Sequence, residues 1–194
     1  MPRQGLDAER VVEEAVRIAD AEGLEAVTLA RVAAALGVRA PSLYNHLAGR
    51  EALLRAITLR GLRELGDAVR RAAVGRARVD ALEALAHAYR VYAHAHPGSY
   101  AATLAPFPAS DAELQRAGDD VVAVIAAIVA GWGLEGDQAI HTVRTIRSAL
   151  RGYVTIELAG GFRKPVDRDR SFEQLVATLV AGLEAAAPPA ATRA

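Results

Sequence analysis

Apolar residues recur at the three- and four-residue spacing of a helix along almost the whole chain, and Gly and Pro interrupt this pattern at intervals. Such spacing places the apolar side chains on one face of each helix, and that face must be buried. Alternating runs of β-branched residues, which would indicate strands, are scarce, and aromatic residues make up only 5% of the sequence. The pattern therefore predicts an all-α fold of about nine helices.

The composition excludes several classes of protein. A chain of 194 residues with 52% hydrophobic and 24% charged residues has enough apolar side chains for a packed core, which excludes a disordered chain. The absence of cysteine excludes disulfide scaffolds, thiol catalysis and Cys-ligated zinc. The longest apolar run, Val121 to Leu134, is too short to cross a bilayer, and acidic residues interrupt the start of the chain where a signal peptide needs apolar ones. We therefore expect a cytosolic (cytoplasmic) protein with no membrane contact.

Local signals place the boundaries of three short helices near the start of the chain. Asp7 is a typical N-cap and Gly23 a typical end for the first helix, and Thr28 and Gly37 have the same roles in the second. Pro41 falls in the first turn of the third helix, where its missing N–H costs little. Three short helices joined by tight turns are typical of a helix-turn-helix unit.

Later helices are expected from the same kind of signal. A long helix is predicted over residues 50–73, followed by a linker, Gly75 to Arg78, that is the best domain boundary. Ser110 with Glu113 and Ser171 with Gln174 form capping boxes, which predict two further helix N-termini.

The third short helix has one buried and one free face. Leu43 and Leu47 lie one turn apart and point inward. The polar and aromatic residues between and beside them then point outward: Ser42, Tyr44, Asn45 and His46. A short helix of this kind suits insertion into the major groove of DNA.

Charge is unevenly distributed, although 23 basic and 23 acidic residues give a net charge of +0. Residues 7–25 hold seven acids and two arginines, a net of −5, whereas residues 39–63 hold five arginines and one glutamate, a net of +4. The neutral total argues against DNA binding, but this segregation predicts a basic edge around the third and fourth helices. Solvated surface charges on an inert helix pair are the alternative explanation.

The third short helix and the residues around it read Val38-Arg39-Ala40-Pro41-Ser42-Leu43-Tyr44-Asn45-His46-Leu47, followed by Arg50-Glu51-Ala52-Leu53-Leu54. This segment resembles the DNA-binding signature of the tetracycline-repressor (TetR) family. The resemblance covers about residues 7–60. It departs from the commonest pattern at Leu47, usually Phe or Val, and at Gly49, usually a Ser, Asn or Asp cap. It implies a helix-turn-helix DNA-binding domain over residues 1–50, with helix 51–74 as a bridge.

The resemblance also implies a role for individual residues. Phosphate contacts, which position the protein without reading sequence, fall to Thr28, Tyr44, His46 and Arg50. The residues that face the bases are Arg39, Ala40, Pro41, Ser42 and Asn45. Among these, Arg39 is suited to guanine and Asn45 to adenine. For His46, a structural role as a helix-end cap is the alternative.

The carboxy-terminal part resembles the WHG-type carboxy-terminal domain of some TetR-family regulators. The residues that carry this resemblance are His141-Thr142-Val143-Arg144, Arg147-Ser148, Arg151-Gly152-Tyr153, Glu157, Gly160-Gly161-Phe162, Asp169-Arg170-Ser171-Phe172, Tyr89-Arg90 and His96-Pro97-Gly98-x-Tyr100. It implies a ligand-binding and dimerisation domain over residues 75–187, followed by a disordered tail, residues 188–194. In this family type the last two helices form the dimer and the preceding ones enclose an effector.

Specific residues are candidates for both roles. A mid-helix glycine tolerates the close approach of another helix, and an apolar stripe beside small residues suits helix docking; the dimer candidates are Gly152, Ala159, Leu175, Leu179, Gly182 and Leu183. The ligand candidates are amphipathic or polar side chains among apolar stretches: Tyr89, Tyr92, Tyr100, Phe107, Trp132, His141, Arg144 and Tyr153. Packing within one protomer is the alternative for both sets. Arg144, Arg147 and Arg151 recur at helical spacing and face either an anionic effector or acids across a dimer.

No catalytic or metal-binding arrangement is convincing. Glu83 with His87, and His94 with His96, are the only pairs that resemble metal ligands, and a surface helix explains them better. Gly-rich phosphate loops and G-x-S-x-G are absent from the sequence, so we expect neither an enzyme nor a cofactor. The sequence predicts a homodimeric transcriptional regulator that binds a palindromic operator in double-stranded DNA, and we expect it to be a repressor that a small-molecule effector releases. A small-molecule-binding helical protein without DNA binding is the alternative.

Overall fold

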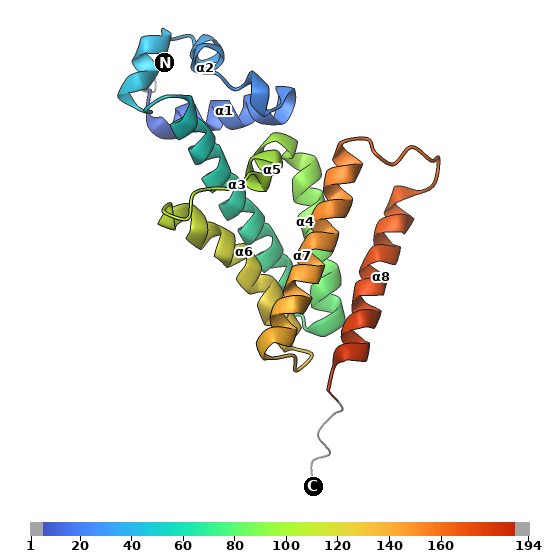
Figure 1. Ribbon diagram of the computed structural model, residues 1–194. Helices are drawn as coiled ribbons and strands as arrows, with labels where there is room; N and C mark the ends of the chain where they lie inside the picture. Colours follow the sequence, from blue (N-terminus) through green and yellow to red (C-terminus); the bar gives the residue numbers. More distant parts are fainter. Residues whose placement is uncertain (1–5, 189–194) are drawn as a thin grey trace. The chain divides into compact units, whose positions relative to one another are not determined.

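The computed structural model describes residues 6–188, and within them every regular element is helical (Figure 1). The elements are α1 (Ala8–Glu22), η1 (Leu24–Ala26), α2 (Leu29–Leu36), η2 (Ala40–Asn45), α3 (Arg50–Ala73), α4 (Arg78–Ala95), α5 (Pro97–Leu104), α6 (Ala112–Ala130), α7 (Gly136–Leu158) and α8 (Arg168–Ala186). The all-α prediction is confirmed. Within residues 6–188, no helix is long and apolar enough to cross a membrane. Apart from Pro188, the predicted tail lies outside the described residues.

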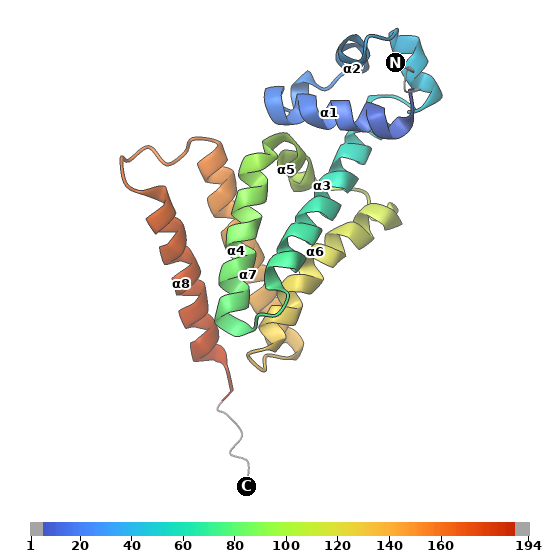
Figure 2. The same cartoon turned by 180° about the vertical axis from the view of Figure 1, so that it is seen from behind.

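The chain forms two compact units. The first unit combines residues up to Glu64 with Tyr92–Ala117, and the second combines Leu65–Val91 with the residues from Gly118 onward. Helices α3, α4 and α6 each contribute to both units (Figure 2). The predicted linker, Gly75 to Arg78, therefore lies inside the second unit. The compact units divide within continuous helices because α5 and the start of α6 pack with the amino-terminal helices.

Local capping chemistry determines the boundaries of the first helices as predicted. The Asp7 side chain accepts a hydrogen bond from Arg10 N at 2.8 Å, and Thr28 Oγ1 accepts one from Arg31 N at 3.1 Å. Gly37 ends α2 in the left-handed region at φ 68°, where a residue without Cβ is favoured. These boundaries depend on residues close in sequence, which is why periodicity and caps were sufficient to predict them.

Two predicted helix starts are wrong. The side chain of Asp111, not Ser110, accepts the capping hydrogen bond at α6, from Leu114 N at 3.2 Å. Helix α8 begins at Arg168 with Asp167 as its N-cap, so Ser171 lies within the helix, where its hydroxyl donates to Asp167 O. In both cases a nearby aspartate caps the helix in place of the predicted serine. Its charged carboxylate is a stronger acceptor at a helix N-terminus than a hydroxyl group.

Two further elements differ from expectation. The third short helix is a 3₁₀ helix, η2, and a short helix, α5, follows α4 directly. Pro97 stands in the first turn of α5, so the same residue that ends α4 also begins the next helix. A 3₁₀ turn is tighter than an α-turn, and side chains three positions apart lie directly above one another in it.

The core of the first unit joins the helix-turn-helix to α3. Its buried residues come from α1, α2, η2 and α3, together with Val27 before α2 and Ala102 on α5. The fully buried ones include Val11, Ile18, Val32, Leu43 and Ile57. A second cluster in this unit packs Leu59 and Leu62 against Leu114 and Ala117 on α6. The helix-turn-helix is thus fixed to the first part of α3 by apolar burial.

In the second unit, a buried ion pair joins α4 to α7. Arg90 donates from Nε to Glu157 Oε2 at 2.8 Å and from Nη2 to Glu157 Oε1 at 2.6 Å, while the Glu157 side chain is only 2% exposed. The same guanidinium donates to Asp169 on α8 and lies 4.9 Å from the Phe172 ring centre. This network fixes α8 to the other helices of the unit because a buried carboxylate requires its partner.

Candidate nucleic-acid interface

The segment from Arg39 to Asn45 presents a small exposed face above one buried anchor. Leu43 is completely buried in the first unit's core, which fixes the orientation of η2. Pro41, Tyr44 and Asn45 are exposed, and Tyr44 retains 61% exposure, which is unusual for a large aromatic side chain. Leu47 is half-buried against the same core, as its predicted inward orientation requires.

Arg39 is an exposed cation at the start of this face. It precedes η2, is exposed, and has no side-chain hydrogen bond or ion pair within the described residues. Ala40 and Ser42 are half-buried beside it. An unpaired guanidinium next to small and polar residues offers two parallel N–H donors, the arrangement that reads guanine.

The N-terminus of α2 offers hydrogen-bond donors to a phosphate. Thr28 is exposed, and its Oγ1 accepts from Arg31 N, so the hydroxyl proton remains available to donate outward. Free backbone N–H groups and the helix dipole at this end also favour an anion. Arg31, which no sequence pattern singled out, lies in this turn and is paired with Glu22 on α1.

Arg50 has a structural role that the sequence did not suggest. Its Nε donates to Val27 O at 3.0 Å and its Nη2 to Leu24 O at 3.3 Å, and Glu25 lies 3.9 Å away. The guanidinium therefore ties the start of α3 to the turn before α2. Its remaining N–H donors are still available for a phosphate, so the structure adds a positioning role to the predicted contact.

His46 is the C-cap of η2, and its backbone N–H donates to Leu43 O at 2.9 Å. Its side chain is half-buried. This position agrees with the helix-end alternative and leaves a phosphate contact as a prediction.

Three of the arginines that suggested a basic edge are neutralised. Arg55 donates from Nε to Asp111 at 2.6 Å and from Nη2 to Glu113 at 2.8 Å, and Arg63 also donates to Glu113 at 2.8 Å. Arg60 pairs with Glu64 at 2.7 Å. The basic edge expected from charges close in sequence is therefore reduced to Arg39, which has no ion pair within residues 6–188, and Arg50, whose ion pair with the exposed Glu25 is long at 3.9 Å.

These ion pairs also change acidities. The side-chain hydrogen bond from Arg55 holds the pKa of Asp111 below its usual value, against a smaller opposing effect of burial. The same guanidinium lowers the pKa of Glu113, with further help from Arg63. The pKa of Arg55 is raised in return. All three groups remain charged near neutral pH.

The ligand candidates are distributed over both compact units. Tyr92, Tyr100 and Phe107 belong to the first unit, whereas Tyr89, Trp132, His141, Arg144 and Tyr153 belong to the second. Tyr89, Tyr92, Tyr100 and Trp132 are buried, and Phe107 packs against a core cluster. His141 and Arg144 are exposed on α7.

Two of the candidate tyrosines use their hydroxyl groups in internal hydrogen bonds. Tyr92 donates to Glu64 at 3.3 Å, and burial, together with the Glu64 charge, raises the pKa of Tyr92. Tyr153 donates to Arg168 O at 2.6 Å, with its ring beside Phe162 and Phe172. Packing accounts for these contacts, and ligand binding by these residues stays a prediction.

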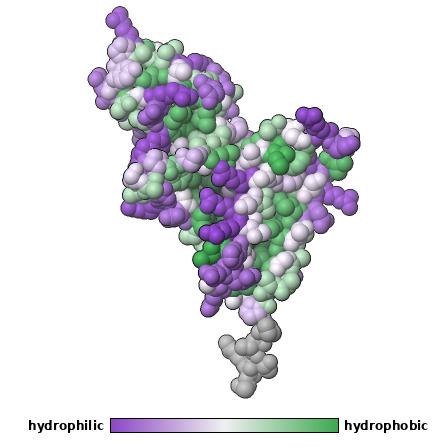
Figure 3. Space-filling model, in the orientation of Figure 1, coloured by the Kyte–Doolittle hydropathy of each residue, from purple (hydrophilic) through white to green (hydrophobic). Residues whose placement is uncertain are grey.

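The residues predicted for the dimer interface differ in how exposed they are. An added Cβ at Gly152 or Gly182 meets no atom within 4 Å in the described structure, so packing in the protomer does not require either glycine. Ala159 is exposed, and Leu175 and Leu179 are half-buried. Leu183 is buried within its own protomer. Figure 3 shows apolar and weakly polar residues side by side over α7 and α8.

Comparison with known proteins matches both parts of the chain. A family model described as "Bacterial regulatory proteins, tetR family" matches residues 11–57, and one described as "Tetracyclin repressor-like, C-terminal domain" matches residues 82–179. An uncharacterized HTH-type transcriptional regulator of Mycobacterium tuberculosis is 38% identical over 180 residues, which cover 92% of this chain and 82% of that protein. The chain belongs to the TetR family. It is a helix-turn-helix transcriptional regulator of that family, so the resemblance predicted from residues 38–54 is confirmed.

Solved structures agree with this TetR-family fold. A protein of unknown function from Rhodococcus sp. RHA1 superimposes with a TM-score of 0.80 at 23% identity, over 95% of this chain and 99% of the other. A TetR variant from Acinetobacter baumannii AYE in complex with minocycline gives a TM-score of 0.71 at 19% identity, over 95% of this chain and 100% of the other. At these identities the likeness concerns the fold.

Proposed function

We propose that the protein is a homodimeric repressor that leaves its operator when a small organic molecule binds its carboxy-terminal part. The observation that carries the DNA-binding half of this proposal is the exposed Arg39–Asn45 segment, anchored by the buried Leu43, within the region that matches the TetR family. The helix-turn-helix places such a segment in the major groove. A bacterial regulator of transcription must reach chromosomal DNA, so we propose a cytoplasmic site of action. We also propose that the protein has no catalytic role, because its family is one of transcription regulators.

The proposed contacts fall into two groups. Arg39, Ala40, Pro41, Ser42 and Asn45 face base edges, and Thr28, Tyr44, His46 and Arg50 face phosphates. The first group determines which sequence is bound, whereas the second determines register on the duplex. With Arg55, Arg60 and Arg63 neutralised, only a few phosphates are contacted by free cations, so non-specific affinity for DNA should be weak.

A dimer supplies the specificity that one short helix lacks. Two copies read half-sites about one helical turn, or a multiple of it, apart, which requires a palindromic operator. We propose that Gly152, Ala159, Leu175, Leu179 and Gly182 on and beside α7 and α8 form the dimer interface. Small residues with open space beside them allow a second pair of helices to approach closely. Leu183 supports this interface only indirectly, from the protomer core.

The second half of the proposal, release by a ligand, is a shift between two populations. A ligand that binds one state better than another moves the equilibrium by its difference in affinity. Helix α3 begins at the helix-turn-helix with Arg50 and continues into the second unit, so a ligand-dependent change in that unit has a continuous helix through which to act. The minocycline complex of the structural neighbour motivates the choice of a small organic molecule.

Fluorescence anisotropy with labelled DNA from the protein's own upstream region tests the DNA-binding half. We expect specific binding that weakens steeply as salt rises, because counterions are released from phosphates. The absence of any salt-sensitive binding to flanking DNA would instead support a small-molecule-binding helical protein without a DNA target.

Sedimentation tests the dimer. Gly152→Leu should convert a dimer to a monomer without lowering the melting temperature of the protomer, because the space beside Gly152 is open. The control is Ala126→Leu, which adds comparable bulk at an exposed position of α6. A Gly152→Leu variant that remains dimeric contradicts the proposed interface.

A further inference from the structure

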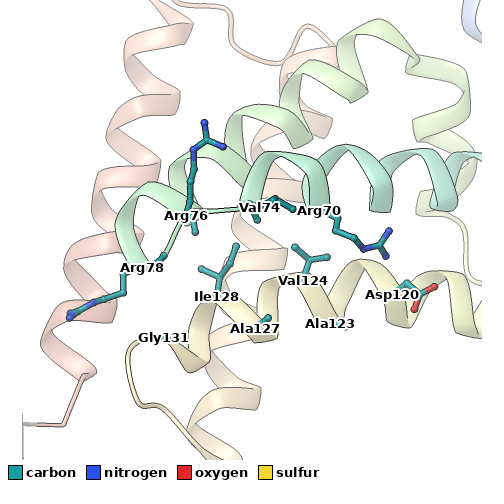
Figure 4. A pocket seen from close by; sticks show the side chains of 13 residues that line it. Arg70, Val74, Arg76, Arg78, Asp120, Ala123, Val124, Ala127, Ile128 and Gly131 are labelled. Atoms are coloured by element: carbon teal, nitrogen blue, oxygen red, sulfur yellow. The ribbon is translucent and has the colours of Figure 1, made fainter.

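A groove of about 460 Å³ lies within the second unit (Figure 4). It is bounded by the C-terminal end of α3, the linker and first turn of α4, and the C-terminal half of α6. Its apolar lining is Ala73, Val74, Ala77, Ala81, Ala123, Val124, Ala127 and Ile128. The helices meet here through alanines, whose short side chains leave the space open. The volume is within the range of about 300–1,000 Å³ typical of small-molecule sites.

The polar lining of this groove is mainly cationic. Arg70, Arg76 and Arg78 contribute to the lining, and Asp120 is the one acid that does so. Figure 4 shows the Arg70 side chain extending along α3 toward Asp120, whereas the Arg76 and Arg78 side chains extend outward from the rim, away from Val124 and Ile128. Three exposed arginines against one acid favour an anion at the rim of the groove, and the apolar floor favours an organic one.

The arginines keep donors for a ligand. Arg76 donates from Nη1 to Ala72 O at 2.6 Å, and Arg70 donates from Nη1 to Asp67 at 2.6 Å. A guanidinium has five N–H donors, so each side chain retains several that water or an acidic group must satisfy. Planar pairs of such donors match a carboxylate or sulfonate.

Arg78 connects the groove to the single tryptophan of the chain. Its guanidinium lies 5.6 Å from the Trp132 ring centre, and Trp132 is 3% exposed. Arg78 has φ 49°, the one positive φ at a non-glycine residue within the described part of the chain. Arg78, which lines the groove, thus brings Trp132 close to it, so Trp132 can act as a fluorescence donor to a bound probe.

The geometry points to a binding site for a small amphipathic organic anion, whose apolar body covers the alanine-rich floor and whose acidic group pairs with Arg70, Arg76 and Arg78. A neutral apolar ligand would leave the remaining donors of these arginines unused, and a free phosphate would leave the floor uncovered. The site includes none of the eight ligand candidates predicted from the sequence. That its ligand is the effector rests on the proposed function.

The test uses a matched pair of fluorescent probes and no DNA. 8-Anilino-1-naphthalenesulfonate has an apolar ring system with one sulfonate, and N-phenyl-1-naphthylamine has the same rings without the charge. Energy transfer from Trp132, the one tryptophan, measures binding of each probe to the protein, and the variants below locate that binding. We expect the anion to bind about tenfold more tightly or better, the range for a hydrogen bond to a charged group.

Three variants locate the binding. Ala127→Phe fills the groove without changing its charge and should abolish binding of both probes. Arg76→Gln should weaken the anion about tenfold and leave the neutral probe unchanged. Arg163→Gln removes the same charge from an exposed loop position and should change neither. Thermal melts followed by circular dichroism verify that each variant is folded.

Equal affinity for the two probes overturns the inference, and so does full anion binding by Ala127→Phe. A change of oligomeric state in Ala127→Phe without loss of probe binding would identify the groove as an interface with a second copy and also overturns it. Operator binding is measured separately, so a regulator that fails to release DNA would contradict the proposed function while leaving the groove's ligand class supported.

Discussion

The carboxylate of Asp20 on α1 accepts a hydrogen bond from the backbone N–H of Ser99 at 2.7 Å, across 79 positions of sequence. Its other oxygen lies 3.2 Å from His96 Nδ1. An aspartate of the helix-turn-helix thus caps the N-terminus of α5, where a carboxylate is favoured by the free N–H groups and the helix dipole. The orientation of the amino-terminal helices within the first unit depends on this contact.

Replacing Asp20 tests that dependence. Asp20→Ala leaves the buried Ser99 N–H without its partner and should lower the free energy of unfolding by about 1–3 kcal/mol in urea denaturation. The control, Asp119→Ala, removes an exposed acid from α6 and should have little effect. Equal destabilisation by the two variants would contradict a specific role for Asp20.

Gly98 permits the close approach of α5 to α1. A Cβ at this position would lie 2.1 Å from the carbonyl carbon and oxygen of Ala19, both of them backbone atoms. Gly98→Ala should therefore destabilise the fold by about 1–3 kcal/mol, as overpacking does. Gly66→Ala is the matched control, since its Cβ would make an ordinary 3.5 Å contact with Val121 and should stabilise α3 by about 0.5–1 kcal/mol. Urea denaturation measures both changes, and a neutral Gly98→Ala variant would refute the requirement.

Substitutions at Arg50 and Arg39 should differ in their effects on stability and on recognition of bases. Arg50→Ala removes two hydrogen bonds to backbone carbonyls and should lower the free energy of unfolding by about 1–2 kcal/mol, and it should weaken binding to all DNA sequences. Arg39→Ala should leave stability unchanged and relax selectivity at one base pair by about 1–3 kcal/mol. Denaturation and binding to a set of single-base operator variants measure these effects. An unchanged selectivity profile for Arg39→Ala would refute its contact with a base.

The Arg55 ion pairs should contribute to stability in a pH-dependent way. The pKa values of Asp111 and Glu113 are lowered from 3.8 and 4.5, so the pairs stabilise the fold above those values and lose this effect as the pH falls through the lower folded-state values. The difference in melting temperature between the wild type and Arg55→Gln should be present at pH 7 and decrease progressively as the pH is lowered below about 4.

Arg116→Gln, at an exposed position of α6, is the control for net charge and should show no such pH dependence. Because Arg55 is already neutralised, Arg55→Gln should also leave operator affinity nearly unchanged. A large loss of DNA binding in this variant would instead show that Arg55 contributes to DNA binding, as the sequence suggested.

Part of this protein was predictable from the sequence alone. Asp7, Thr28 and Gly37 determine helix ends through partners within a few residues, and the spacing of Leu43 and Leu47 determines which face of η2 is free. Local hydrogen bonds and apolar periodicity depend on neighbouring positions, so the helix-turn-helix and the family were visible in the pattern of residues 7–60.

Only the tertiary structure determines which charged side chains are paired and where the groove lies. Arg55 meets Asp111 across 56 positions, Asp20 meets Ser99 across 79, and the groove is formed by three helix segments from residues 70–131. Charge counted along the sequence predicted a basic edge, yet Asp111 and Glu113 at the start of α6 pair with Arg55 and Arg63. Only the Arg60–Glu64 pair, one helical turn apart, follows a local rule. The physical reason is that ion pairs and cavities depend on distance in space, and the other positions that meet here are too far apart in the chain for any local rule to relate them.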